Sequence, residues 1–268
     1  MTDHATALAD FEASTFTHDG KARTVYRQGT GPAVVVIHEM PGLTPAVADF
    51  GRRVVAAGFS AWLPALFGTP GRPMSNPYIA QSISWGCVNR EFTAFAAGRT
   101  SPIIVWLRAL AAEAHDTCGG PGVGAVGMCF TGGFALAMMI DDRMLAPVLS
   151  QPSLPLPVTK RNKADLGISP ADLQRVKTRA ADGACVLGLR FTEDAAVPAA
   201  RFETLRRELG DAFIAVEIDS SPGNPWGIAK RAHSVLTEDL VDEPGHPTRA
   251  ALDRVLAFFA ERLHSPVS

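Results

Sequence analysis

The stretch that decides the fold is Gly124-Ala-Val-Gly-Met-Cys-Phe-Thr-Gly-Gly133. The apolar run at 123–126 predicts a buried strand leading into it, and Phe134-Ala-Leu-Ala-Met-Met-Ile140 predicts an apolar helix leading out. Cys129 therefore stands at a strand-to-helix corner. Such a corner lifts a side chain above the sheet and directs backbone N–H groups at a bound group, so Cys129 is the candidate nucleophile.

Strands and helices are predicted to alternate on both sides of this corner. Continuous apolar strands separated by helices are typical of a doubly wound, mostly parallel sheet, which is an α/β fold. We expect one domain over residues 1–268, with the Pro-rich segment 151–180, including a short helix at 169–173, forming a surface excursion or partial lid. The expected strands are 15–17, 24–27, 33–37, 59–63, 144–149, 184–189 and 213–218, and the further helices are 44–58, 100–117, 199–209 and 247–263.

Composition restricts the class of partner. The net charge of −2 gives no electrostatic reason to expect nucleic acid or an anionic membrane, so we expect a small-molecule partner. No run approaches the roughly 20 apolar residues of a membrane helix, and the first residues do not resemble a signal peptide, so a cytoplasmic protein is expected. The four cysteines lack metal-ligand spacing, so no metal is expected. No cofactor is expected. A monomer or homodimer is expected.

A cysteine nucleophile requires a base, because a free thiol with a pKa of about 8.5 is mostly protonated at neutral pH. In sheets of this type the chain order is nucleophile, acid, histidine. Asp194 or the adjacent Glu193 follows the predicted strand 184–189 and is the candidate acid. His233 follows the strand 213–218, and its order and spacing favour it over His246, which we expect in an exposed loop.

A second carboxylate follows the first central strand. Glu39 lies in the loop His38-Glu39-Met40-Pro41-Gly42, at the carboxyl end of the strand 33–37, where open α/β sheets place their ligand sites. Two other interpretations stay open for Glu39, namely a cap of the next helix or a solvated loop position. His38 is expected to be buried and hydrogen bonded.

These residues together resemble the dienelactone hydrolases, a cysteine-nucleophile branch of the α/β-hydrolase fold. The resemblance rests on four segments, spans roughly residues 20–262 and keeps their order: Val126-Gly-Met-Cys-Phe-Thr-Gly-Gly133, His38-Glu-Met-Pro-Gly42, Thr192-Glu-Asp-Ala-Ala-Val-Pro198 and Ala232-His233. It implies an α/β-hydrolase fold and hydrolysis of a small ester or lactone through a thioester.

The resemblance also implies roles for particular residues. Cys129 is the nucleophile, His233 the base and Asp194 the acid that orients it, while Glu39 is a carboxylate near the thiol that helps to take its proton when substrate binds. The resemblance further implies that the backbone N–H groups of Phe130 and Met40 form the oxyanion hole.

The sequence departs from the family pattern at two positions. Thr131 is inserted before the paired glycines of the corner, and as a β-branched residue it is expected to crowd the strand–helix contact and reshape the pocket floor. Thr237 stands where the family has a substrate-binding arginine, so Arg72, Arg90 or Arg190 is a candidate to replace it. Tyr78 and Trp85 are candidates to line the pocket mouth, although ordinary packing also explains them.

Two further functions stay open on the sequence. The alternative to a hydrolase is a non-catalytic small-molecule binding protein or thiol redox sensor on the same fold, suggested by Thr131 and the missing arginine. A dinucleotide-binding protein is less well supported, because the loop at 39–43 lacks Gly-x-Gly-x-x-Gly.

Overall fold

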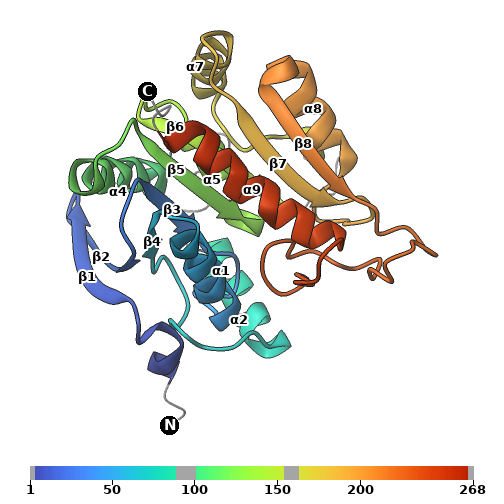
Figure 1. The fold of residues 1–268 in the computed structure, drawn as a ribbon, viewed down its shortest axis with the longest axis horizontal. Helices are drawn as coiled ribbons and strands as arrows, with labels where there is room; N and C mark the ends of the chain where they lie inside the picture. The colour runs from blue at the N-terminus through green and yellow to red at the C-terminus, as the bar shows by residue number, and fades with distance from the viewer. Residues whose placement is uncertain (1–3, 89–100, 154–162, 265–268) are drawn as a thin grey trace.

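The described chain is organised around one mostly parallel β-sheet (Figure 1). The computed structural model describes residues 4–88, 101–153 and 163–264, with the side chains of Ala5 and of 83–88 excepted. Within these residues the sheet has eight strands in the order β1-β2-β4-β3-β5-β6-β7-β8, and only β2 (Lys21–Gln28) pairs antiparallel, with β1 (Glu12–His18) and β4 (Ser60–Pro64). The predicted α/β architecture is confirmed.

The remaining elements follow the predicted alternation. Helix α5 begins only at Gly132, because a 3-10 turn, Cys129–Thr131, intervenes after the strand. The short helix expected at 169–173 extends over twelve residues as α7. The other bounds are β3 Ala33–Ile37, α1 Pro45–Ala56, α2 Asn76–Val88, α4 Pro102–Cys118, β5 Val123–Met128, α5 Gly132–Met138, β6 Met144–Ser150, α7 Pro170–Ala181, β7 Val186–Phe191, α8 Ala199–Leu209, β8 Phe213–Ile218 and α9 Pro247–Leu263, with 3-10 turns at His4–Leu8 and Gly210–Ala212.

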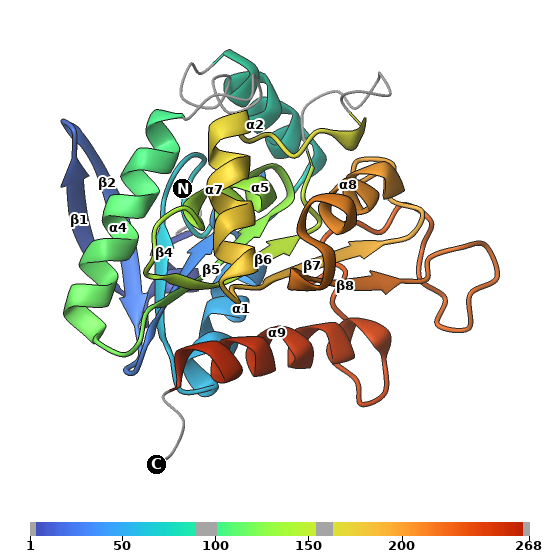
Figure 2. The ribbon, with the colours of Figure 1, turned by 90° about the horizontal axis from the view of Figure 1, so that it is seen from above.

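Helices cover both faces of the sheet, as Figure 2 shows. Side chains alternate between the faces of a strand, so a strand covered on both sides must be apolar throughout. Strand β3 illustrates this: Val34 and Val36 pack in the core shared with α1 and α9, whereas Val35 and Ile37 pack in the core shared with α4 and α5. The unbroken apolar run predicted from the sequence therefore has partners on each side.

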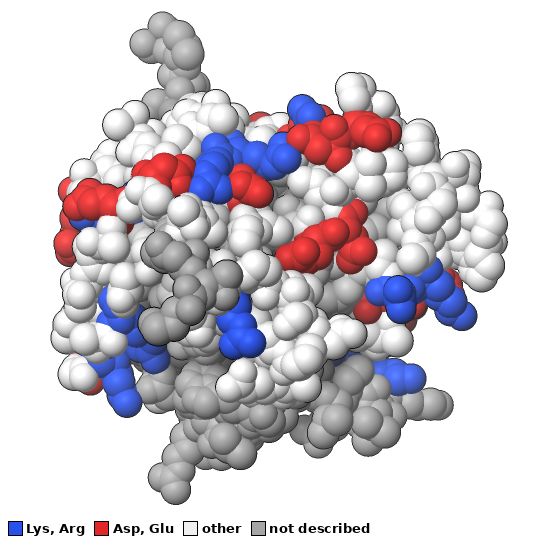
Figure 3. Space-filling view, turned by 90° about the horizontal axis from the view of Figure 1, so that it is seen from below, with Lys and Arg blue, Asp and Glu red and all other residues white. Residues whose placement is uncertain are grey.

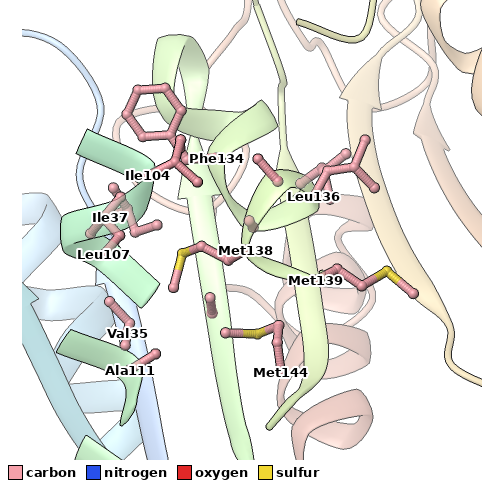
Figure 4. Packing of buried hydrophobic residues seen from close by; sticks show 14 of the residues in the cluster. Val35, Ile37, Ile104, Leu107, Ala111, Phe134, Leu136, Met138, Met139 and Met144 are labelled. Carbon is pink, nitrogen blue, oxygen red and sulfur yellow. The ribbon is translucent and has the colours of Figure 1, made fainter. Parts of the chain in front are cut away.

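The helix behind the Cys129 corner is held in one of these cores. In Figure 4, Phe134 and Met138 of α5 point toward Ile104 and Leu107 of α4. All four side chains are at most 1 % exposed. Because protein interiors are close-packed, this contact fixes the helix that begins at the corner.

The pairing of β3 with β5 brings their carboxyl ends together. Ile37 lies opposite Gly127 in parallel register. The residues that follow each strand, Glu39 and Cys129, therefore emerge at the same edge of the sheet, as expected for parallel strands.

The segment 151–180 is only partly described. Helix α7 is the crossover between β6 and β7 and packs against α5 and α8, so it belongs to the helical layer on one face of the sheet. Residues 154–162 lie outside the described residues. A partial lid therefore stays a prediction.

On the face shown in Figure 3, acidic and basic side chains occur in small mixed groups separated by uncharged areas. This distribution agrees with the near balance of charges in the sequence. No helix of the described chain has the length and apolar character needed to cross a membrane.

Candidate active site

Cys129 occupies a tight corner between β5 and α5. Its φ is 56°, which is the left-handed region that non-glycine residues rarely adopt and that the nucleophile of an α/β-hydrolase elbow requires. Gly127 permits the turn, because a Cβ there would lie 2.2 Å from the carbonyl oxygen of Thr131. The side chain of Cys129 is partly exposed, so it is accessible from the carboxyl edge of the sheet.

Thr131 joins the two loops of the site, the one after β3 and the turn after β5. It is fully buried, and its hydroxyl accepts a hydrogen bond from the Met128 backbone N–H at 3.0 Å. The same oxygen lies 2.9 Å from the carbonyl oxygens of Ile37 and Met128 and 3.1 Å from that of His38. These backbone groups provide partners for the buried hydroxyl, and the expected effect of Thr131 on the pocket floor stays a prediction.

The acid and the histidine meet as predicted from chain order. His233 Nδ1 lies 2.6 Å from Asp194 Oδ2, and Asp194 is 8 % exposed. The adjacent Glu193 is exposed and lies 3.9 Å from Lys230 Nζ, so it does not orient the imidazole. His246 was expected in an exposed loop, but it is buried and caps α9 by accepting from the Thr248 N–H.

The surroundings of His233 favour its protonated form. Burial lowers its pKa, but the charge of Cys129 and hydrogen bonds to Asp194 and Cys129 outweigh burial. The pKa of His233 therefore lies well above its ordinary value of 6.5.

Glu39 lies beneath this group in a network of neutral donors. It is 1 % exposed, and Ser234 Oγ donates to Oε2 at 2.7 Å, Gln151 Nε2 donates to Oε2 at 3.2 Å and Thr237 Oγ1 donates to Oε1. Burial raises the pKa of Glu39, while these bonds and the charge of His233 lower it in part. Neither open alternative for Glu39 holds, since the carboxylate is buried and Thr44 caps α1.

His38, the residue before Glu39, is buried and hydrogen bonded as predicted. Its Nδ1 lies 2.9 Å from the Glu39 carbonyl oxygen, and its Nε2 accepts from the Leu66 N–H at 3.1 Å. Burial lowers the pKa of His38 to about 4, so the ring is neutral and supports the loop.

Sequence reasoning missed Ser153, which follows β6. Its Oγ lies 3.3 Å from Cys129 Sγ, and its backbone N–H donates to the Cys129 carbonyl at 2.9 Å. Gln151, two residues earlier, also reaches the site through Glu39. Their position directly after a central strand was the available signal, but serine and glutamine in a Pro-rich loop carry no motif.

The candidate substrate-binding residues are divided between two places. Half-buried Arg72 lies over the Tyr78 ring, with Cζ 4.0 Å from the ring centroid, and both line a cavity of about 180 Å³ beside the Met40–Pro41 loop. Ser82 also lines this cavity and donates to the Pro41 carbonyl at 3.2 Å. Arg90 and the Trp85 side chain lie outside the described residues.

Arg190 does not face this cavity. It is 4 % exposed, and its guanidinium pairs with Glu217 on β8 and donates to the Val197 carbonyl at 3.0 Å. It therefore braces the loop that carries Asp194 and is committed to the protein interior. In the described chain, no three His, Cys, Asp or Glu side chains gather in a way that would hold a metal ion.

The fold matches solved α/β hydrolases over almost the whole chain. A candidate dienelactone hydrolase from Klebsiella pneumoniae has a TM-score of 0.63 and 20 % identity, covering 94 % of this chain and 99 % of that chain. A dienelactone hydrolase from Anabaena variabilis gives 0.60 and 17 %, covering 95 % and 98 %. A cold-adapted esterase from an Arctic intertidal metagenomic library gives 0.57 and 14 %, covering 94 % and 93 %. At these identities the likeness establishes the fold alone.

The sequence itself establishes the family. The dienelactone hydrolase family model matches residues 21–263. The chain therefore belongs to the dienelactone hydrolase family and is a hydrolase of that family. A comparison with curated protein sequences finds no match.

Proposed function

We propose that this protein hydrolyses a small ester or lactone through a Cys129, His233 and Asp194 triad. The observation that carries the proposal is the meeting of three chain segments: a cysteine in the left-handed conformation after β5, and a histidine and aspartate 2.6 Å apart from the loops after β8 and β7. The raised pKa of His233, which is hydrogen bonded to Asp194 and lies beside Cys129, supports His233 as the group that exchanges a proton with the Cys129 sulfur.

The reaction then runs in two halves. The Cys129 sulfur attacks the carbonyl carbon, and the oxyanion accepts hydrogen bonds from the backbone N–H groups of Phe130 and Met40. The C–O bond breaks as His233 gives its proton to the leaving oxygen, which leaves a thioester on Cys129. Water attacks the thioester, His233 takes the proton from that water, and the acid and the thiolate are released.

Asp194 and Glu39 act on His233 in different ways. Asp194 fixes the ring through Nδ1, so that Nε2 is left for the proton transfers. Glu39 acts as a buried negative charge that favours the imidazolium, and Ser234, Thr237 and Gln151 keep it in place. In this role it resembles the family glutamate that helps to take the thiol proton.

An active-site titration with p-nitrophenyl acetate tests the triad. The expected result is a stoichiometric burst of p-nitrophenol and a transient acetyl group on the Cys129 peptide, both absent in Cys129→Ala. Cys118→Ala is the matched control, because Cys118 is partly buried at the end of α4 and precedes strand β5, whereas Cys129 follows that strand. Full turnover by Cys129→Ala would show that the nucleophile is assigned wrongly. Binding of p-nitrophenyl acetate without a burst would favour the non-catalytic alternative.

The substrate is proposed to carry a negative charge that Arg72 binds in the cavity beside Met40–Pro41. Support comes from the guanidinium held against the Tyr78 ring at the cavity wall. Arg72→Met is expected to lower kcat/KM for p-nitrophenyl hemisuccinate by about 10- to 100-fold, the value of a charged hydrogen bond, and to spare p-nitrophenyl acetate. An equal loss for both esters would contradict the assignment. Arg72→Lys, which keeps the charge, should retain part of the preference.

A further inference from the structure

The loop that follows β6 contacts the candidate nucleophile at two points. Ser153 donates its backbone N–H to the Cys129 carbonyl at 2.9 Å, and its hydroxyl lies 3.3 Å from the Cys129 sulfur. The serine is only 9 % exposed. The first contact fixes the backbone of the loop against the corner. The Ser153 hydroxyl is therefore held in position beside the Cys129 sulfur.

Two further features hold this loop in place. Gly132 allows its approach, because a Cβ at that position would lie 2.5 Å from Cα of Pro152, the residue before Ser153. Behind the loop, Arg201 is 2 % exposed and donates to the Pro152 carbonyl at 2.7 Å. The hydroxyl is therefore preorganised at the sulfur, as a group that acts on a reacting atom must be.

The direction of the hydrogen bond follows from the other partners. Asp194 occupies His233 Nδ1, and Glu39 receives its hydrogen bonds from three neutral side chains. When the proton of the pair resides on His233, the sulfur has none to give, and the Ser153 hydroxyl must be the donor.

We propose that Ser153 is a further catalytic residue, whose hydroxyl donates to the Cys129 thiolate and holds it ready for attack. The inference rests on Cys129 being the nucleophile of the proposed function. As the sulfur forms its bond to the carbonyl carbon, its negative charge moves to the carbonyl oxygen and the hydrogen bond from Ser153 weakens. The serine keeps its proton throughout, and it donates again when the thioester breaks and the thiolate returns.

The pH dependence of alkylation tests this role without using turnover. Iodoacetamide forms a bond to the Cys129 sulfur with loss of iodide, and mass spectrometry of the Cys129 peptide gives the rate for that residue alone. In Ser153→Ala the rate is expected to fall about 10-fold near neutral pH, because a hydrogen bond to a charged group is lost. In strong alkali, where the thiol is ionised in both proteins, the rates should agree, so the pH midpoint moves upward.

Ser60→Ala is the matched control. Ser60 is also buried, at 5 % exposed, and its hydroxyl accepts from Trp62 Nε1 at 3.2 Å in strand β4. This variant should alkylate as the wild type does at every pH. An unshifted midpoint in Ser153→Ala would overturn the proposal, and so would an equal slowing at all pH values, which would indicate a purely structural effect. The burst assay on Cys129→Ala separately decides whether the proposed function fails.

Discussion

Replacing Thr131 by valine tests whether its hydroxyl joins the two loops of the site. Valine has nearly the same shape, so it fills the same buried space and removes only the oxygen. That oxygen accepts from the Met128 N–H at 3.0 Å and approaches the carbonyl oxygens of Ile37, His38 and Met128. Thr131→Val therefore leaves a buried N–H without its acceptor and removes one donated hydrogen bond.

The magnitude follows from these two losses. A buried donor left unsatisfied costs about 1–3 kcal/mol, and a neutral hydrogen bond contributes about 1 kcal/mol. We expect Thr131→Val to lower the free energy of unfolding by about 2–4 kcal/mol. Because Met128 and His38 directly precede Cys129 and Glu39, we also expect kcat to fall with little change in KM.

Urea denaturation followed by circular dichroism measures the first effect, and steady-state hydrolysis of p-nitrophenyl acetate measures the second. Thr131→Ser is the control, since it keeps the hydroxyl and loses one methyl group, at a cost of about 1 kcal/mol. The reasoning is refuted if Thr131→Val unfolds within about 0.5 kcal/mol of the wild type, because surface-like tolerance is incompatible with an unsatisfied buried N–H.

Three further changes probe the site. Burial raises the pKa of Glu39 in the folded protein. The contribution of this carboxyl to the free energy of unfolding is therefore fully present below its ordinary pKa of 4.5 and is lost as pH rises through the raised pKa. The stability of Glu39→Gln relative to wild type, from urea melts, should therefore improve between about pH 4 and pH 8, and a constant difference would argue against burial as the dominant cause. Asp194→Asn should reduce kcat by about 10³- to 10⁴-fold. The alkaline limb of the pH–rate profile of this variant should also move to lower pH, because Asp194 helps to raise the pKa of His233. An unmoved alkaline limb would contradict that role. Gly132→Ala should cost about 1–3 kcal/mol in thermal or urea unfolding, because the new Cβ meets Pro152 Cα. The pH midpoint of Cys129 alkylation in Gly132→Ala should move upward, as in Ser153→Ala. A midpoint equal to that of the wild type would show that displacing the loop does not affect Cys129.

Local sequence signals were sufficient for the sheet and its helices. The strands 33–37 and 213–218 and the helix 199–209 have the bounds that apolar runs and flanking Gly or Pro predict. These features depend on residues that are neighbours in the chain. The chain order of nucleophile, acid and histidine likewise follows from the topology of the sheet. It correctly predicted that Asp194 lies beside His233.

The errors concern residues whose partners are distant in the chain. The hydrogen bonding of Thr131 was missed, because its hydroxyl lies 2.9 and 3.1 Å from the carbonyl oxygens of residues 37 and 38, which are 94 and 93 positions earlier in the chain. His246 was expected to be exposed, but it packs against the Trp226 ring at a centroid distance of 5.5 Å and caps a helix. Residue type and spacing do not encode such contacts, so only the folded chain reveals them.

Thr237 shows how a departure from a family pattern can be internal to the site. Its position suggested the loss of a cation for the substrate, whereas its hydroxyl donates to buried Glu39. The neutral donors around Glu39 and the charge of His233 offset in part the effect of burial on the Glu39 pKa, and His233 also faces Asp194 and the Cys129 sulfur. Asp194 and Cys129 raise the pKa of His233, and in the proposed reaction the proton on this imidazole passes to the leaving oxygen of the ester. When the Cys129 sulfur has lost its proton in the proposed reaction, the hydroxyl of Ser153, 3.3 Å away on the loop after β6, is a neutral donor to it.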